Sequence, residues 1–144
     1  SSGVTANVAL QFAWHKLIQI FTQDEQTNVG TIVSGRAIPV EGIEKSVGLY
    51  INTLPLTVNW CEEQSVQQVL NGIQESISEL NGHSNIALSD LQSDGERLFH
   101  SIMVFENYPM PEKVTEGIGA HIEFRSSVEK LDYPPVLMAY ENDE

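Results

Sequence analysis

The side chains in this sequence best suited to bind metals or act as bases and nucleophiles are four histidines and one cysteine. The histidines are far apart, and none has the spacing of a zinc site; they are His15, His83, His100 and His121. We expect His15 and His121 to be solvated. His100 lies in an apolar run, so we expect it to be a core histidine with its hydrogen bonds satisfied.

Cys61 can in principle form a nucleophile pair with a distant histidine, but only the residue types support such a pair. The sequence contains no Gly-x-Ser-x-Gly elbow and no Gly-rich phosphate loop. The carboxylates are scattered along the sequence, and we interpret them as solvated surface charges. The residues by themselves therefore contain no complete catalytic set and no metal site.

A different kind of candidate lies at residues 47–60, VGLYINTLPLTVNW, where Asn52 and Thr53 interrupt an apolar run. Polar side chains inside such a run either satisfy nearby backbone groups or bind something else. From the residues alone, the structural role for Asn52 ranks ahead of the functional one. Pro55 has no N–H to give to a sheet, so we expect the strand to stop pairing there.

Composition limits the classes of function. The chain has 144 residues, the size of one domain, and 41% hydrophobic residues, so we expect a packed core. Its net charge of −13 repels phosphate backbones and anionic membranes, which excludes nucleic-acid and membrane binding. No apolar run approaches the ~20 residues of a membrane span. A single cysteine forms no internal disulfide, and we expect a cytoplasmic location.

Two amphipathic helices are predicted. Thr5 can cap a helix of about 17 residues, with an apolar face formed by Leu10, Ala13, Trp14, Leu17, Ile18 and Phe21. Ser65 and Gln68 form a capping-box pattern at the start of the second helix, and Gly82 is well placed to end it. The apolar face of this helix comprises Val66, Val69, Leu70, Ile73, Ile77 and Leu80.

The remaining periodic segments predict strands and short helical turns. Short turns are expected at residues 43–46 and 86–91, and strands at residues 29–33, 98–105, 118–125 and 136–140. Helices and strands are mixed along the chain, without internal repeats. The fold class is therefore α/β or α+β, a two-layer sandwich with helices packed on one face of a mixed sheet.

Four ordered segments resemble the condensation domains of nonribosomal peptide synthetases. Residues 30–36, GTIVSGR, resemble the family's G-x-x-x-SGR strand. Residues 42–55, GIEKSVGLYINTLP, are similar to its GIE-x-x-VGLFINTLP motif. Residues 83–92 resemble the H-x-x-x-PL-x-x-I segment, with Ala87 in place of proline. Residues 98–109, LFHSIMVFENYP, match LFD-x-x-x-VFENYP, with His100 in place of aspartate.

This resemblance implies a fold like that of chloramphenicol acetyltransferase, with two lobes around a channel. Phosphopantetheine arms of two carrier domains enter the channel, and the acceptor amine attacks the donor thioester to form a peptide bond. The family's His-His-x-x-x-Asp-Gly motif, which carries the catalytic histidine, is not in these residues. We therefore expect residues 1–144 to be one domain, most of the C-terminal lobe, without the N-terminal lobe and the last C-terminal elements.

The resemblance also suggests site residues and partners. Ser34, Gly35 and Arg36 would lie near the channel, and Asn52 and Thr53 near the path of the pantetheine arm. Asn52 would either bind the amide of that arm or hold the loop before Pro55. No cofactor is expected to bind directly. The implied partners are the N-terminal lobe, the upstream and downstream peptidyl carrier domains, and a neighbouring adenylation domain.

Two further functions remain open. The chain can be a carrier-docking or scaffold module without chemistry, or, less well supported, a small hydrolase that uses Cys61. The length of the native polypeptide separates the first of these from an enzyme fragment. About 150 to 200 residues before Ser1, with the His-His motif, would favour the enzyme.

Overall fold

The structure is a computed structural model that describes residues 3–37, 39–92, 95–106 and 132–140. The predicted strand at residues 118–125 and His121 lie outside the described residues. The elements, in chain order, are α1 (Ala6–Thr22), β1 (Gln26–Ser34), η1 (Gly35–Ala37), η2 (Ile43–Lys45), β2 (Ile51–Asn59), α2 (Val66–Gly82), α3 (Leu88–Leu91), β3 (Ile102–Glu106) and β4 (Val136–Tyr140).

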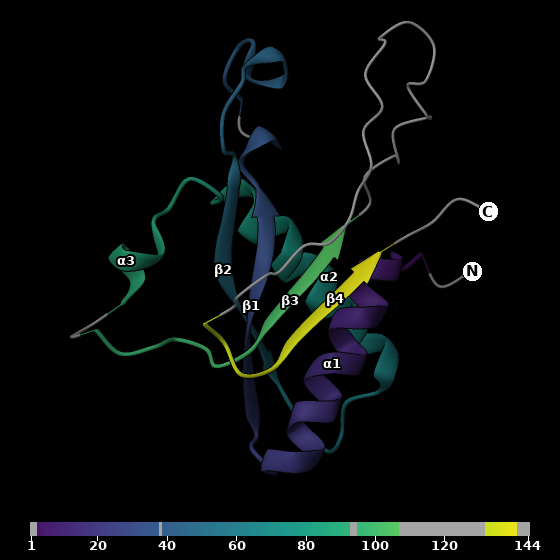
Figure 1. Cartoon of the computed structure of the whole chain (residues 1–144). Helices are drawn as coiled ribbons and strands as arrows, with labels where there is room; N and C mark the ends of the chain where they lie inside the picture. The colour runs from purple at the N-terminus through teal and green to yellow at the C-terminus, as the bar shows by residue number, and fades with distance from the viewer. Residues whose placement is uncertain (1–2, 38, 93–94, 107–131, 141–144) are drawn as a thin grey trace, which may run out of the picture.

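The four strands form one mixed sheet in the order β2-β1-β3-β4. β1 is antiparallel to β2 and parallel to β3, and β3 is parallel to β4. α1 and α2 pack against each other and against one face of this sheet (Figure 1). The predicted two-layer arrangement of a mixed sheet with helices on one face is confirmed. No helix in the described part of the chain is long and apolar enough to cross a membrane.

The prediction that β2 stops pairing at Pro55 is wrong, because β2 pairs with β1 from Ile51 to Asn59. Pro55 lies opposite Gly30, whose N–H donates to the Ser101 carbonyl at 2.8 Å on the β3 side. Gly30 thus points its polar groups away from β2, so the missing N–H of Pro55 lies on the outer edge of the sheet. Proline is tolerated at such an edge position.

α2 has the start and the buried face that its sequence predicts. The Ser65 hydroxyl accepts from the Gln68 N–H at 3.4 Å, and the Gln68 side chain accepts from the Ser65 N–H at 2.9 Å, a complete capping box. Ile73, at the centre of the apolar face, is buried in the main core cluster, with Val8, Leu56 and Val58.

α1 starts as predicted, with Thr5 as its N-cap, but buries a different face. Its buried side chains are Val8, Gln11 and His15, while much of the predicted apolar face remains accessible. The reason lies in β1, which presents hydroxyl side chains to this helix. The Gln11 amide donates to Thr31 Oγ1 at 3.0 Å, so the polar row of α1 finds partners in the sheet.

Residues 98–101 were predicted as part of a strand, but β3 begins only at Ile102. In this lead-in segment Phe99 is buried and His100 is exposed, so the prediction of a core histidine is wrong. Phe99 packs directly on Gly30, where an added Cβ would clash with the phenyl Cε2. Glycine at this position thus allows the Phe99 ring to cross the backbone of β1.

Candidate functional site

The five predicted site residues come together at one end of the β1–β2 pair. Ser34 ends β1, and Gly35 and Arg36 form the turn that follows it. Asn52 and Thr53 lie at the start of β2, opposite Val33 and Ile32 of β1. Antiparallel pairing thus places two sequence motifs beside each other at this end of the sheet.

Gly35 keeps the chain just after β1 close to the chain just before β2. Its N–H donates to the Tyr50 carbonyl at 2.6 Å. An added Cβ would lie 3.2 Å from the same carbonyl oxygen, tighter than most Cβ contacts, and a backbone atom cannot easily move away. The Ser34 hydroxyl is exposed next to this turn, where it accepts from the Arg36 N–H at 3.4 Å.

Arg36 braces the long connection between the two strands, from residue 39 to residue 50. Its guanidinium donates to the Ile43 carbonyl at 2.8 Å and to the Ser46 carbonyl at 3.2 Å. It also lies 4.6 Å from the centre of the Tyr50 ring, within the range of a cation–π contact. Tyr50 and Ser46 are joined by a hydroxyl–hydroxyl hydrogen bond. The connection is therefore held in one shape by its own contacts.

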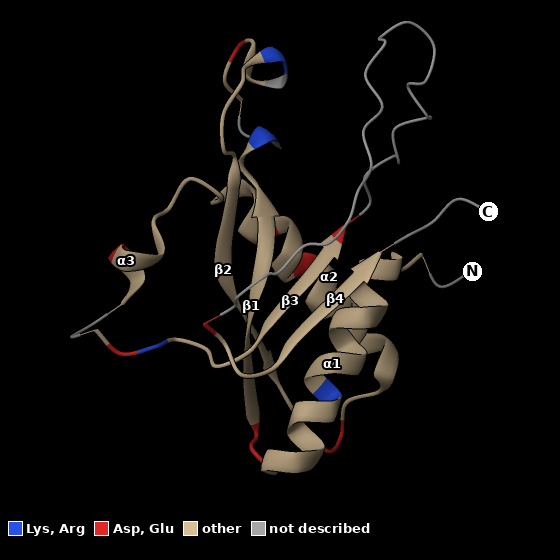
Figure 2. Ribbon diagram, viewed as in Figure 1, with Lys and Arg blue, Asp and Glu red and all other residues tan. Residues whose placement is uncertain are grey.

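This braced connection presents apolar side chains to solvent. Val47 is fully exposed and Leu49 is 87% exposed, and Val40 and Ile51 are about half exposed. The connection projects beyond the end of the sheet (Figure 1). The segment from residue 36 to residue 50 carries two basic residues, Arg36 and Lys45, and two acidic ones, Glu41 and Glu44, so its charges balance (Figure 2). An ordered, apolar projection has the character of a contact surface.

The side chain of Asn52 is bonded within the chain. Its Nδ2 donates to the Ser84 carbonyl at 2.9 Å and to the Ile86 carbonyl at 2.6 Å. Its Oδ1 accepts from the Thr53 N–H at 2.8 Å. Both amide protons are thus used to fasten residues 84–86 to the edge strand, and only Oδ1 keeps a free lone pair.

His15 is fully buried, so the prediction of a solvated histidine is wrong. Its Nδ1 lies 2.8 Å from Thr27 Oγ1, and the Trp60 indole N–H donates to the same oxygen at 3.0 Å. The Thr27 hydroxyl proton is then free to be donated to Nδ1, which fits a neutral ring with its proton on Nε2. Burial lowers the pKa of His15 from 6.5 to about 4.

This buried polar row on α1 was missed by reasoning from sequence. A signal was present, because Val8, Gln11 and His15 repeat at helical spacing, and Thr27 and Thr31 lie on one side of the next strand. His83 and Cys61 are exposed. Among the described residues, no three His, Cys, Asp or Glu side chains are grouped so as to hold a metal ion.

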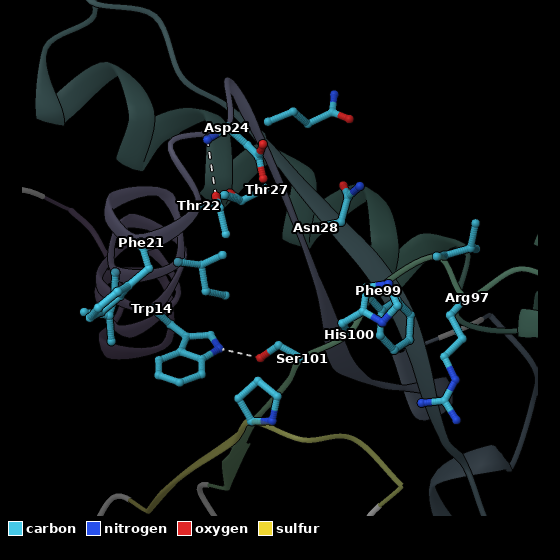
Figure 3. Close-up of a pocket in the computed structure, with 15 residues that line it drawn as sticks. Trp14, Phe21, Thr22, Asp24, Thr27, Asn28, Arg97, Phe99, His100 and Ser101 are labelled. Carbon is cyan, nitrogen blue, oxygen red and sulfur yellow. Dashed lines mark hydrogen bonds between the residues drawn. The ribbon is translucent and has the colours of Figure 1, made fainter.

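A separate apolar groove of about 670 Å³ lies at the other end of β1, between α1 and the segment before β3. Figure 3 shows its two walls, with Trp14 and Phe21 on α1 and with Phe99, His100 and Arg97 across the cavity. The Trp14 indole N–H donates to Ser101 Oγ at 2.9 Å and joins the walls at the base. None of the five predicted site residues lines this groove.

Comparison with solved structures supports the fold. The chain is similar to the first condensation domain of the calcium-dependent antibiotic synthetase in complex with a substrate analogue, with a TM-score of 0.64 and 20% identity, over 74% of this chain and 24% of that one. It is also similar to the crystal structure of holo T3CT, with a TM-score of 0.67 and 22% identity, over 74% of this chain and 26% of that one.

Curated relatives are large synthases of which the chain spans a small part. It is 40% identical to N-(5-amino-5-carboxypentanoyl)-L-cysteinyl-D-valine synthase of Amycolatopsis lactamdurans, over 98% of this chain and 4% of that protein. It is 34% identical to surfactin synthase subunit 3 of Bacillus subtilis (strain 168), over 100% of this chain and 12% of that protein. The family model of the condensation domain matches residues 1–144, the whole chain. The chain therefore belongs to the condensation domain family.

Proposed function

We propose that this chain is part of a nonribosomal peptide synthetase condensation domain that forms a peptide bond between two carrier-bound substrates. The acceptor amine attacks the donor thioester, the new C–N bond forms, and the donor carrier leaves as its thiol. Within that domain the chain is most of the C-terminal lobe and forms one wall of the substrate channel. The His-His-x-x-x-Asp-Gly motif and its catalytic base belong to the N-terminal lobe.

The observation that carries this proposal is the meeting of Ser34, Gly35 and Arg36 with Asn52 and Thr53 at one end of β1 and β2. These residues lie beside a braced, exposed apolar connection that is suited to contact another part of the protein. In this reading the connection faces the N-terminal lobe. The exposed Ser34 hydroxyl is then the group with most freedom to bond to substrate.

The partners follow from the same reading. The phosphopantetheine arms of an upstream and a downstream carrier domain enter the channel, and an adenylation domain supplies the activated amino acid. The chain binds no cofactor of its own. We place the synthetase in the cytoplasm, where the exposed thiol of Cys61 stays reduced.

The test is to narrow the proposed channel at Ser34 in the intact synthetase. Ser34→Trp is expected to lower peptide-bond formation by at least about tenfold, because a misplaced substrate loses its attack geometry. Loading of both carriers should be unchanged. Asn59→Trp is the control, since Asn59 is exposed at the opposite end of β2. Product is measured by mass spectrometry of the carrier-bound peptide.

If Ser34→Trp and the wild type form the peptide bond at equal rates, Ser34 does not line the channel. An intact protein that binds both loaded carriers but forms no product would instead favour the alternative, a docking or scaffold module without chemistry.

A further inference from the structure

The connection between β1 and β2 has little packing of its own to fix its shape. Of the side chains of residues 39–50 that the structure describes, only Ile43 is buried. Gly42 has a φ of 79°, and the single turn of η2 that follows it is too short to be stable alone. Segments with so few buried contacts open easily. The order of this connection must therefore come from the contacts that fasten it to the sheet.

Two side chains, Arg36 and Tyr50, supply those contacts from the two ends of the connection. The Arg36 guanidinium donates through Nη1 to the Ile43 carbonyl, and through both Nη1 and Nη2 to the Ser46 carbonyl. The Ser46 hydroxyl donates to the Ile43 carbonyl at 3.0 Å, so its oxygen accepts from the Tyr50 hydroxyl. The Tyr50 ring faces the guanidinium at 4.6 Å. We call these two side chains the Arg36–Tyr50 clamp.

Arg36 uses most of its binding capacity inside the chain. A guanidinium has five N–H donors and two flat faces. Three hydrogen bonds of Arg36 go to two carbonyls of the connection, and one of its faces covers the Tyr50 ring. The Ser34 hydroxyl differs, because it is exposed and its proton is free to be donated. This contrast gives Arg36 the role of holding the wall and leaves substrate contact to Ser34.

We infer that Arg36 and Tyr50 are positioning residues for peptide-bond formation. They hold the connection in one shape against the end of β1, and neither touches substrate. The inference rests on the proposed function, in which this part of the chain forms the channel wall. Bond formation depends steeply on placement, and a shift of about 1 Å can cost about 100-fold in rate. A wall that moves would spread the substrate over unproductive positions, so the clamp acts on the rate of the chemical step.

The first test measures condensation kinetics of the intact synthetase with loaded carriers. Arg36→Lys keeps the positive charge but loses the planar fork and the stacking surface, and Tyr50→Leu removes the ring with its hydroxyl. Each change is expected to lower kcat at least about tenfold and to leave KM for the acceptor carrier within about twofold. The double variant should lose no more than the worse single variant, because both changes open the same clamp.

Arg97→Lys is the matched control. Arg97 donates to the Asp132 carbonyl at 3.0 Å and lies 5.3 Å from the centre of the Tyr133 ring, so it makes the same kind of contact as Arg36. It lines the apolar groove at the other end of β1, away from the proposed channel wall. Its replacement should therefore leave kcat within about twofold of the wild type.

The second test measures hydrogen exchange of the connection in the same intact proteins. The N–H groups of Lys45 and Ser46 donate to the carbonyls of Gly42 and Ile43 within the connection. Both clamp variants should speed the exchange of these amides at least about tenfold and leave the amides of α2 unchanged. Arg97→Lys should change neither set of amides.

Several results would overturn the inference. Faster exchange with a normal kcat would mean that the shape of the connection does not affect the reaction, and a raised KM with unchanged exchange would mean that Arg36 binds substrate or carrier. Additive losses in the double variant, or faster exchange in α2 as well, would also contradict a shared local clamp. The wild type checks the proposed function separately. A wild-type synthetase that forms no peptide bond contradicts that function, while the exchange rates still show whether the clamp holds the connection.

Discussion

The two long helices begin alike, but one buries apolar side chains and the other a mixture of apolar and polar ones. Each has 17 residues and a hydroxyl N-cap, Thr5 in α1 and Ser65 in α2. α2 turns its apolar stripe toward the sheet. α1 shares the same apolar core through Val8, but it also buries Gln11 and His15 and leaves Phe21 exposed. An amphipathic pattern therefore shows that a helix has a face to bury, but it does not show which neighbour covers that face.

The difference arises from the strands below the helices. β2 offers Leu56 and Val58 to the core that contains Ile73 of α2. β1 offers the hydroxyls of Thr27 and Thr31 to α1. A buried polar group is costly when it lacks a hydrogen bond, and the two threonines provide partners for Gln11 Nε2 and His15 Nδ1. Gln11 Oε1 and His15 Nε2 have no hydrogen-bond partner among the described residues, so the polar contact is only partly compensated. The apolar face of α1 stays accessible, with Phe21 80% exposed.

The largest expected effect is on the α2 side of this comparison. Ile73→Ala should lower the free energy of unfolding by roughly 2–5 kcal/mol, because it empties a packed core position. Val66→Ala is the control on the same stripe, since Val66 is 59% exposed, and it should change stability by no more than about 0.5 kcal/mol. Urea unfolding measures both. A loss below about 1 kcal/mol for Ile73→Ala would mean that α2 packs less tightly than described.

Local signals in the sequence predicted most of the elements. Hydroxyl caps located the starts of both helices, and the apolar run at residues 136–140 became β4. The resemblance assigned the SGR motif to the channel and Asn52 and Thr53 to the path of the pantetheine arm, and the β1–β2 register places the two motifs beside each other. These features depend on short-range periodicity and on residues that favour helix caps or turns. Both kinds of signal can be recognised in a single sequence.

Features that depend on tertiary neighbours were not predictable in the same way. Pairing through Pro55 is possible because β2 is an edge strand, and strand order is not visible in the local pattern. The burial of His15 depends on Thr27, a strand residue that meets it only in the folded chain. His100 is exposed because β3 starts two residues later. In each case a contact in three dimensions outweighed the local pattern.

The next effect tests the buried polar face of α1 through pH. The pKa of His15 is 6.5 when unfolded and about 4 in the folded chain, so between these values the unfolded chain binds more protons. Its contribution to stability is complete above about pH 6.5 and is lost as the pH falls toward 4. At pH 4.5 the loss from this group is roughly 2–3 kcal/mol.

The measurement compares urea unfolding at pH 7 and at pH 4.5. The drop in stability should be smaller by roughly 2–3 kcal/mol in His15→Leu than in the wild type. His83→Gln serves as the exposed control and should retain the full drop. If His15→Leu and the wild type lose the same stability on acidification, the polar face of α1 is open to water, and the contrast between the two helices disappears.

A smaller effect concerns how α2 is fastened at its end. Asn52 donates to the carbonyls of Ser84 and Ile86, just beyond α2, so Asn52→Ala should cost about 1–3 kcal/mol from unpaired carbonyls. The melting temperature should fall, while condensation per folded molecule stays normal. A normal melting temperature with a several-fold loss of condensation at limiting carrier would assign Asn52 to substrate binding. Thermal unfolding and a product assay on one preparation separate these outcomes.

The smallest effect in the 144-residue chain is expected at the exposed apolar face of α1. Phe21→Ser removes a side chain that is 80% exposed, so it should change the unfolding free energy of this chain by no more than about 0.5 kcal/mol. Urea unfolding of the chain measures the change. A loss above about 1 kcal/mol would mean that the Phe21 ring is packed in the folded chain, and the contrast between the exposed apolar face of α1 and the buried face of α2 would then disappear.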